Sequence, residues 1–265
     1  MAVGIKAHQL SIGYRERLLA TDIQLHVPRG QIVCLLGPNG CGKTTLFKTL
    51  LGLLPARAGS VDIDGLGMHT LSPQAVARRI AYVPQTQGPV FPYTVEEIVL
   101  MGRTARVGLF SAPTLRDREI AAEALAKLHI AHLGTQTFPT LSGGQRQLVL
   151  IARALAQQTP YVVLDEPTAA LDFGNQMKVL EQIRALADAE LGLILSTHNP
   201  DHAFAVADQV VLMSKDGVTP AQPPAVQLTG ERLSALYDHP IDVVTLADER
   251  RFCVSGPRQG TYRSP

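Results

Sequence analysis

The chain alternates short, wholly apolar runs with longer segments in which apolar residues recur every three or four positions. Short apolar runs predict strands that are buried on both faces, and a spacing of three to four predicts amphipathic helices. The predicted buried strands are residues 32–36, 80–83, 161–166, 193–197 and 210–214. Because helical patterns separate most of these strands, we expect an α/β fold with a mostly parallel sheet that is covered on both faces.

Other short strands lie outside that parallel set. Residues 8–11 and 23–27 are predicted to form an antiparallel β edge, joined by a turn at residues 13–17. Near the end of the chain, residues 243–246 and 252–254 are also strand-like.

The block from residue 86 to residue 159 has a different character. Pro and Gly open it, and a capping box at Thr94 then begins a series of helical patterns. We therefore predict an inserted all-helical subdomain at residues 86–159, within a single domain whose α/β core consists of residues 1–85 and 160–265.

Composition and charge narrow the class of protein. The 265 residues are 46% apolar, which suffices for a sizeable core, and the net charge of +1 gives no sign of a nucleic-acid partner. The apolar runs are too short to span a bilayer, and the N-terminus lacks the long apolar stretch of a secretory signal. Three cysteines without metal-ligand spacing suit a reducing compartment. We expect a soluble, cytoplasmic protein.

A glycine-rich stretch follows the first buried strand and precedes a helical pattern. Its sequence, GPNGCGKTT at residues 37–45, has the form GxxxxGK[ST] in the strand–turn–helix setting of a phosphate-binding loop. In such a loop Lys43 reaches the β- and γ-phosphates and Thr44 binds Mg²⁺. The sequence therefore predicts that the chain binds a nucleoside triphosphate, through Gly37, Asn39, Gly40, Cys41, Gly42, Lys43, Thr44 and Thr45.

Candidate catalytic residues follow three of the buried strands. Asp165 ends one strand, where its carboxylate can hold Mg²⁺, and the adjacent Glu166 is placed to orient an attacking water. His198 ends another strand and either contacts the γ-phosphate or the water, or is a structural histidine. Gln85 follows a third strand and is a candidate sensor of Mg²⁺ or water.

A second glycine-rich anion site lies in the helical block. Ser142 caps a predicted helix, and Gly143 and Gly144, followed by Gln145, leave its first N–H groups accessible. Since the chain has one nucleotide motif, this site either serves a second copy of the chain or is a simple helix cap. Asp172 likewise either caps a helix or faces a partner.

Two further side chains near the phosphate loop have open roles. Tyr14 either stacks on a nucleotide base or, as its position alone favours, is a surface tyrosine of a hairpin. For Cys41 we expect the helix N-terminus and Lys43 to favour a reactive thiolate, the alternative being a packed, inert thiol.

Taken together, these motifs resemble the ATPase subunits of ATP-binding cassette (ABC) transporters over about residues 8–240. The matching segments are the Walker A loop (37–45), the signature (141–145), the Walker B strand with its glutamate (162–166), the Q-loop glutamine (Gln85), the D-loop (169–172) and the switch histidine (His198). The resemblance implies a P-loop NTPase core that binds ATP with Mg²⁺. It also implies that Tyr14 stacks on adenine. Ala169 departs from the serine frequent in the family.

The resemblance also implies partners. Two subunits would enclose two ATP molecules head to tail as a homodimer, each lending its signature to the other's phosphate loop. An integral membrane permease would dock at about residues 86–110, although apolar residues there such as Leu109 alternatively form the small core of the insert.

Finer details favour one branch of the family. The stretches FPYTV at residues 91–95 and STHNPDHA at residues 196–203 look like those of importers of ferric siderophores, haem, cobalamin or molybdate. A periplasmic or surface substrate-binding protein would then act indirectly, with this subunit peripheral on the inner face of the cell membrane. The competing hypothesis is a soluble ABC ATPase that has no transport role.

Overall fold

The computed structural model describes residues 3–15, 17–85, 92–107, 112–169 and 171–256. Within these residues, six strands form the main sheet, in the order β10-β9-β3-β8-β7-β6. All neighbours are parallel except the edge pair β10 and β9. The strands are β3 (Ile32–Leu36), β6 (Ile80–Val83), β7 (Tyr161–Leu164), β8 (Gly192–Thr197), β9 (Gln209–Ser214) and β10 (Gly217–Val218). The predicted mostly parallel sheet is confirmed.

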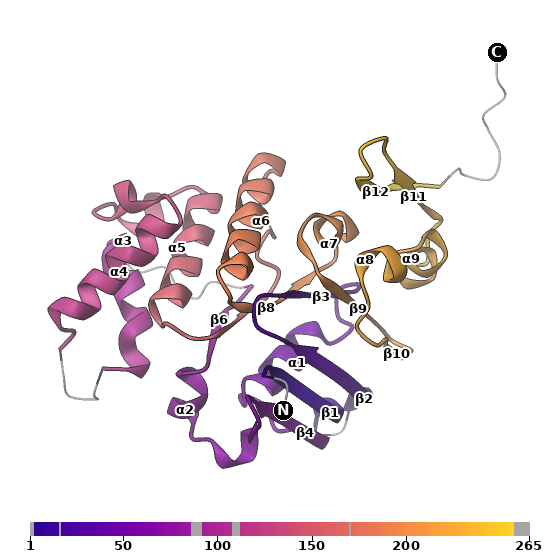
Figure 1. The fold of residues 1–265 in the computed structure, drawn as a ribbon, viewed down its shortest axis with the longest axis horizontal. Coiled ribbons are helices and arrows are strands. Elements are labelled where there is room, and N and C mark those ends of the chain that lie inside the picture. The colour runs from indigo at the N-terminus through magenta and orange to yellow at the C-terminus, as the bar shows by residue number, and fades with distance from the viewer. Residues whose placement is uncertain (1–2, 16, 86–91, 108–111, 170, 257–265) are drawn as a thin grey trace.

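The described residues also form a four-stranded antiparallel sheet, which lies beside the main sheet (Figure 1). Its order is β2-β1-β4-β5, with β1 at Ile5–Tyr14, β2 at Arg17–Val27, β4 at Ala58–Ile63 and β5 at Leu66–Gly67. The antiparallel edge is thus confirmed, and its first two strands are longer than predicted. The sequence underestimated them because exposed polar residues interrupt their apolar pattern.

Helix α1 (Lys43–Leu50) packs between the two sheets. Leu46, Phe47 and Leu50 are fully buried, in a core cluster that includes Val33 and Leu35 of β3. Successive side chains of a strand point to opposite faces, so the neighbouring residues of β3 join a second cluster on the other face of the sheet. Helices α5 (Gly143–Ala156), α6 (Phe173–Asp188) and α7 (Pro200–Val206) cover that second face. This arrangement fixes both ends of the loop between β3 and α1.

The described part of the block between residues 86 and 159 is helical and lies at one end of the molecule, on the left of Figure 1. Capping boxes at Thr94, Thr114 and Ser142 begin its α-helices, because each hydroxyl accepts an N–H of the first turn that lacks a helical partner. The elements are α3 (Val95–Leu100), η2 (Met101–Ala105), α4 (Leu115–Lys127), η3 (Ala131–Leu133), η4 (Phe138–Thr140) and α5. Before this block lie η1 (Met68–Thr70) and α2 (Pro73–Ala77).

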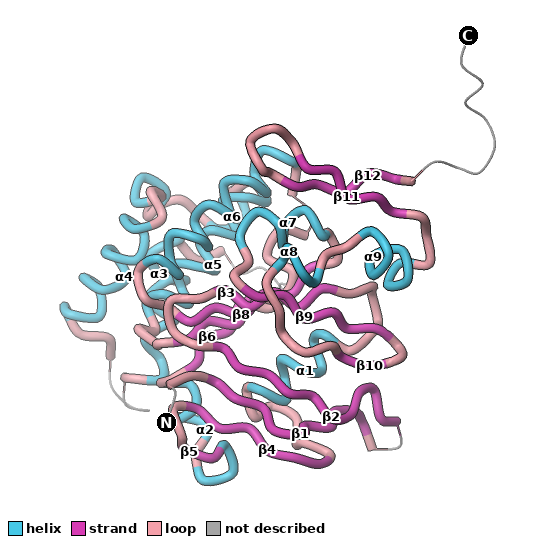
Figure 2. Tube along the Cα trace, turned by 45° about the vertical axis from the view of Figure 1, so that its right-hand side comes forward, coloured by secondary structure: helices cyan, strands magenta, loops and turns pink. Residues whose placement is uncertain are grey.

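The C-terminal segment packs at the opposite end (Figure 2). It consists of α8 (Pro224–Gln227), α9 (Gly230–Tyr237) and an antiparallel hairpin of β11 (Ile241–Thr245) and β12 (Arg251–Ser255). Strand β12 contacts α7, and β11 contacts α9. Across all the described residues, no helix has the length and apolar character needed to cross a bilayer.

Candidate functional site

The loop between β3 and α1 is tightly constrained by neighbouring backbone. A Cβ added at Gly37 would lie 2.1 Å from the carbonyl oxygen of Met213 on β9, so only glycine fits there. Gly40 and Gly42 have φ values of 80° and 112°, in the left-handed region that favours glycine. The loop therefore curls over the N-terminus of α1, as its sequence predicted.

Lys43 lies inside this curl, with its side chain almost fully buried. Its ammonium donates to the carbonyl oxygens of Gly37 at 2.8 Å and Pro38 at 3.1 Å. The same nitrogen lies 3.3 Å from a carboxylate oxygen of Glu166. A buried cation and anion are thus held at the mouth of the loop, where a phosphate oxygen can take over contacts to Lys43.

Asp165 connects the phosphate loop to the main sheet. Thr44 donates its hydroxyl to Oδ2 of Asp165 at 2.8 Å, and Tyr82 of β6 donates to the same oxygen at 3.4 Å. Ser196 of β8 donates to Oδ1 at 2.6 Å. The sequence prediction that Thr44 and Asp165 share one site is consistent with this geometry, because both side chains meet at the carboxyl ends of parallel strands.

Glu166 is held through both its backbone and its side chain. Its backbone has a φ of 48°, unusual for a residue other than glycine, and its N–H donates to the Ser196 hydroxyl at 2.9 Å. Among the described residues, Gln85 Nε2 donates to Oε2 of Glu166 at 3.0 Å, and His198 Nδ1 lies 3.2 Å from that oxygen. Gln85, Glu166 and His198, predicted from separate parts of the sequence, are therefore neighbours.

Tyr14 also comes close to the phosphate loop. It ends β1, its side chain is half exposed, and Thr45 donates a hydroxyl hydrogen bond to its phenol oxygen at 3.4 Å. Asn39 and Gly40 at the tip of the loop are exposed. An exposed aromatic ring therefore lies beside Thr45, at the end of the phosphate loop.

The signature residues Ser142, Gly143, Gly144 and Gln145 begin α5. Ser142 and Gln145 form a capping box, and a Cβ on Gly144 would lie 2.8 Å from the side chain of Asn175 on α6. Among the described residues, no hydrogen bond or ion pair joins these four to the phosphate loop of the same chain. Asp172 caps α6 by accepting the N–H of Asn175 at 2.9 Å. Both helix-cap assignments are confirmed, and Asn175 lies next to both caps.

The expectation of a reactive thiolate at Cys41 is wrong. The side chain is buried, and burial raises the pKa of the thiol more than the nearby Lys43 lowers it. The sequence argument weighed the helix N-terminus and the lysine but had no measure of burial.

Sequence reasoning missed several polar residues that organise the site. Ser196 is fully buried between Asp165 and Glu166. His202 on α7 is buried too, with Nδ1 3.2 Å from the hydroxyls of both Thr168 and Thr197. Burial is the main cause that lowers the pKa of His202. A hydroxyl residue within the apolar run LILST at 193–197 was the available signal for Ser196.

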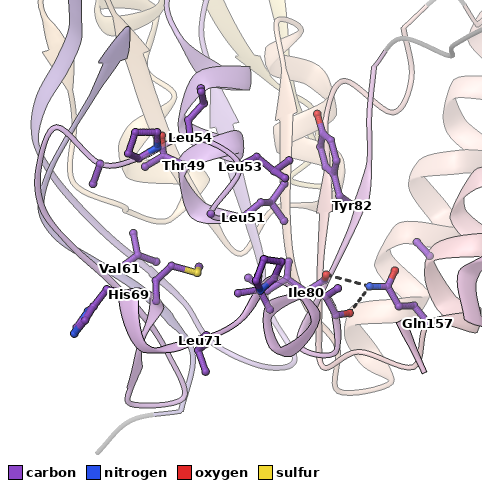
Figure 3. Close-up of a pocket in the computed structure, with 18 of the residues that line it drawn as sticks. Thr49, Leu51, Leu53, Leu54, Val61, His69, Leu71, Ile80, Tyr82 and Gln157 are labelled. Atoms are coloured by element: carbon purple, nitrogen blue, oxygen red, sulfur yellow. Dashed lines mark hydrogen bonds between the residues drawn. The ribbon is translucent and has the colours of Figure 1, made fainter. Parts of the chain in front are cut away.

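A large apolar cavity lies between the core and the helical elements, and Tyr82, which contacts Asp165, is one of its lining residues (Figure 3). Its volume is about 950 Å³, and Leu53 and Leu54 after α1, Leu71 before α2 and Gln157 after α5 are among its lining residues. Gln157 donates to the carbonyl oxygens of Ala77 and Ile80, which joins the two sides of the cavity. A second cavity of about 980 Å³ adjoins it and is lined by residues of α2, α3 and η2. We call the two cavities together the apolar groove.

Comparison with known proteins agrees with the site. The family model described as ABC transporter matches residues 20–169. An uncharacterized ABC transporter ATP-binding protein of Haemophilus influenzae is 43% identical, over 88% of this chain and 89% of that protein. The hemin import ATP-binding protein HmuV of Nocardia farcinica is 40% identical, over 86% of this chain and 78% of its own length.

A solved structure gives the same result for the fold. An ABC transporter assigned to the metal-chelate type, in an inward-facing conformation, superposes with a TM-score of 0.85 and 32% identity, covering 96% of this chain and 98% of that chain. The chain therefore belongs to the ABC transporter family. It is an ATP-binding subunit with ATPase activity, part of a transporter complex with membrane subunits.

Proposed function

We propose that this chain hydrolyses ATP as a homodimer and thereby powers import of a metal chelate or a related substrate through a membrane permease. The substrate class is supported by the similarity to a hemin import protein and to a transporter of the metal-chelate type. The observation that carries the hydrolytic part is the placement of Glu166, whose carboxylate meets Lys43, Gln85 and His198.

We assign the predicted nucleotide-binding residues to ATP. Gly37, Asn39, Gly40, Cys41, Gly42, Lys43, Thr44 and Thr45 would cradle the phosphates, and Tyr14 would stack on the adenine. The half-exposed ring of Tyr14 beside Thr45 supports that role.

The metal assignment is Mg²⁺. The Thr44 hydroxyl and the Asp165 carboxylate lie 2.8 Å apart, and hard oxygen donors of this kind suit Mg²⁺. We also assign Gln85 to the metal through its amide oxygen, because its amide nitrogen already donates to Glu166 at 3.0 Å. When bound with ATP, Mg²⁺ would neutralise charge on the phosphates.

In the reaction we assign the proton transfer to Glu166. Its carboxylate would accept a proton from the attacking water, while the new bond forms to the γ-phosphorus and ADP leaves. Lys43 would stabilise the phosphate charge, and His198 and Gln85 would keep the carboxylate oriented toward the water.

The experiment is the substitution Glu166→Gln, which keeps the shape and removes the base. We expect ATP binding to persist and kcat to fall by about 10²–10⁴-fold, the usual contribution of a general base. The matched control is Glu181→Gln, an exposed glutamate on α6, with normal kcat. Hydrolysis at the normal rate by Glu166→Gln would refute the assignment of the base.

The same variant tests the dimer. The signature residues Ser142, Gly143, Gly144 and Gln145 make no polar contact with their own phosphate loop among the described residues, which supports a role at the loop of a second copy. With hydrolysis blocked, ATP should shift the Glu166→Gln protein to a dimer in size-exclusion chromatography. A monomer at saturating ATP would contradict the proposal.

For the permease we propose docking at the apolar groove and the adjoining residues 86–110. Membership of a transporter complex supports a permease helix as the occupant, and the exposed Leu53, at 64%, supports an apolar contact. Leu109 and Phe110, predicted for this surface, lie outside the described residues, as does Phe91.

The docking test is Leu53→Glu. Because this side chain is exposed, the charge should leave the melting temperature and basal ATPase of the isolated subunit unchanged, while transport by the assembled complex fails. The control Val226→Glu, on α8 and 51% exposed, should transport normally. Normal transport by Leu53→Glu would contradict docking there. We place the subunit on the inner face of the membrane, with a substrate-binding protein reached only through the permease and with no nucleic acid as partner.

A further inference from the structure

His198 is held weakly through its side chain. The side chain is 53% exposed, and its one polar contact among the described residues is the 3.2 Å approach of Nδ1 to Glu166. A half-exposed ring with a single long contact has several rotamers open to it. The position of the ring therefore depends on how firmly the backbone at His198 is fixed.

The backbone of His198 is fixed from the C-terminal segment. The phenol of Tyr237, 39 residues further along the chain, donates to the carbonyl oxygen of His198 at 2.8 Å. This carbonyl lies after the last residue of β8 and before the N-cap of α7, outside both hydrogen-bonding ladders. Tyr237 thus supplies a partner that neither element provides.

Tyr237 is itself anchored. It is the last residue of α9 and packs on the second core cluster, to which the fully buried Leu233 belongs. Burial raises the pKa of its phenol, so the hydroxyl keeps its proton. Ser234 of α9 exchanges hydrogen bonds with the backbone of Ile241, donating at 3.2 Å and accepting at 2.9 Å. The donor therefore lies on a helix that is hydrogen-bonded to the start of β11.

A second bond holds the far end of the same turn. The N–H of Cys253 on β12 donates to a carboxylate oxygen of Asp201, in the first turn of α7, at 2.8 Å. The C-terminal segment consequently contacts the turn from His198 to Asp201 at both ends.

We propose that Tyr237 is a positioning residue, through which the C-terminal segment fixes His198 against Glu166. The inference rests on the proposed function, in which His198 orients the catalytic carboxylate. Loss of the phenol hydrogen bond would let the His198 backbone shift, and small misplacements of catalytic groups lower the rate of the chemical step. ATP binding would be unaffected, because the bond lies outside the phosphate loop.

The test compares Tyr237→Phe with Ser255→Ala in the full chain. Phenylalanine keeps the packing and removes only the hydroxyl. We expect kcat for ATP hydrolysis to fall about 3–10-fold, the size expected for one lost hydrogen bond, with an unchanged KM. The control removes another hydroxyl of the segment, one that contacts His239 at 3.0 Å, and should be normal. Melting temperatures and nucleotide binding report whether each variant is folded.

Two further variants, His198→Ala and the double variant, distinguish failure of this inference from failure of the proposed function. His198→Ala should be slower than Tyr237→Phe, and the double variant should be no slower than His198→Ala, because Tyr237 acts through His198. Normal kcat in Tyr237→Phe beside a slow His198→Ala would overturn the positioning role alone, as would an additive loss in the double variant. Normal kcat in His198→Ala would overturn both the proposed role of His198 and this inference.

Discussion

The serine between the two carboxylates of the site offers a sharp test of the structure. Ser196 is fully buried, donates to Oδ1 of Asp165 at 2.6 Å and accepts the N–H of Glu166 at 2.9 Å. The substitution Ser196→Ala removes both bonds and little volume. It leaves two buried groups, Oδ1 of Asp165 and the backbone N–H of Glu166, without the serine as a hydrogen-bond partner.

The cost follows from those two groups. A hydrogen bond to a charged group contributes roughly 1.5–3 kcal/mol, and an unsatisfied buried donor costs roughly 1–3 kcal/mol. We therefore expect Ser196→Ala to lose about 3 kcal/mol of unfolding free energy. At about 2–4 °C per kcal/mol for a chain of this size, the melting temperature should fall by about 6–12 °C. Hydrolysis should slow as well, since Asp165 and Glu166 lose a shared anchor.

The assay is thermal unfolding followed by circular dichroism, together with urea unfolding for the free energy. The control is Ser214→Ala at the end of β9, whose hydroxyl accepts the N–H of Asp216 in an exposed turn and should cost less than about 1 kcal/mol. If Ser196→Ala and Ser214→Ala have the same melting temperature, the two buried hydrogen bonds do not stabilise the fold as argued.

Three other side chains give predictions that follow from their pKa values. Burial raises the pKa of both Cys41 and Cys253, the latter to about 12. We therefore expect neither thiol to react with a chromogenic thiol reagent near pH 7 until urea unfolds the chain. Rapid reaction of Cys41 in the native protein would contradict this prediction. The Thr114 hydroxyl and the Arg103 guanidinium lower the pKa of Asp117 from 3.8 to about 2. This stabilisation is present above about pH 4 and is lost as pH falls toward about 2, so Asp117→Asn should flatten the fall in melting temperature over that window, and an equally steep fall would contradict it.

Much of the fold was predictable because its signals are local. Strands β3 and β6 begin and end at the predicted residues, since each is an apolar run that a glycine or a proline follows. The capping box at Thr94 and the helix cap at Ser142 are local in the same sense, because neighbouring residues are enough to predict each of them. The order of the strands in the sheets was not predictable, because pairing between distant segments leaves no mark within either segment.

The site divides in the same way. The phosphate loop and the carboxylates at Asp165 and Glu166 are contiguous patterns, so spacing was enough to find them. Ser196 and Tyr237 contact residues 31 and 39 positions away in the chain. The sequence around each residue does not predict these contacts. Cys41 was misjudged for a related reason, since burial depends on the whole fold.

The position of β3 has a consequence for how the protein is made. This strand carries the phosphate loop, and its two neighbours in the sheet are β8 and β9, which end at residues 197 and 214. The loop itself contacts both strands. The N–H of Gly37 donates to the carbonyl oxygen of Thr197, and Gly37 packs against the backbone of Met213. A nascent chain emerging from the ribosome therefore has its nucleotide loop long before the strands that shape it. We expect ATP to act on folding only in the last stage of synthesis, when it can select chains in which both strands have docked.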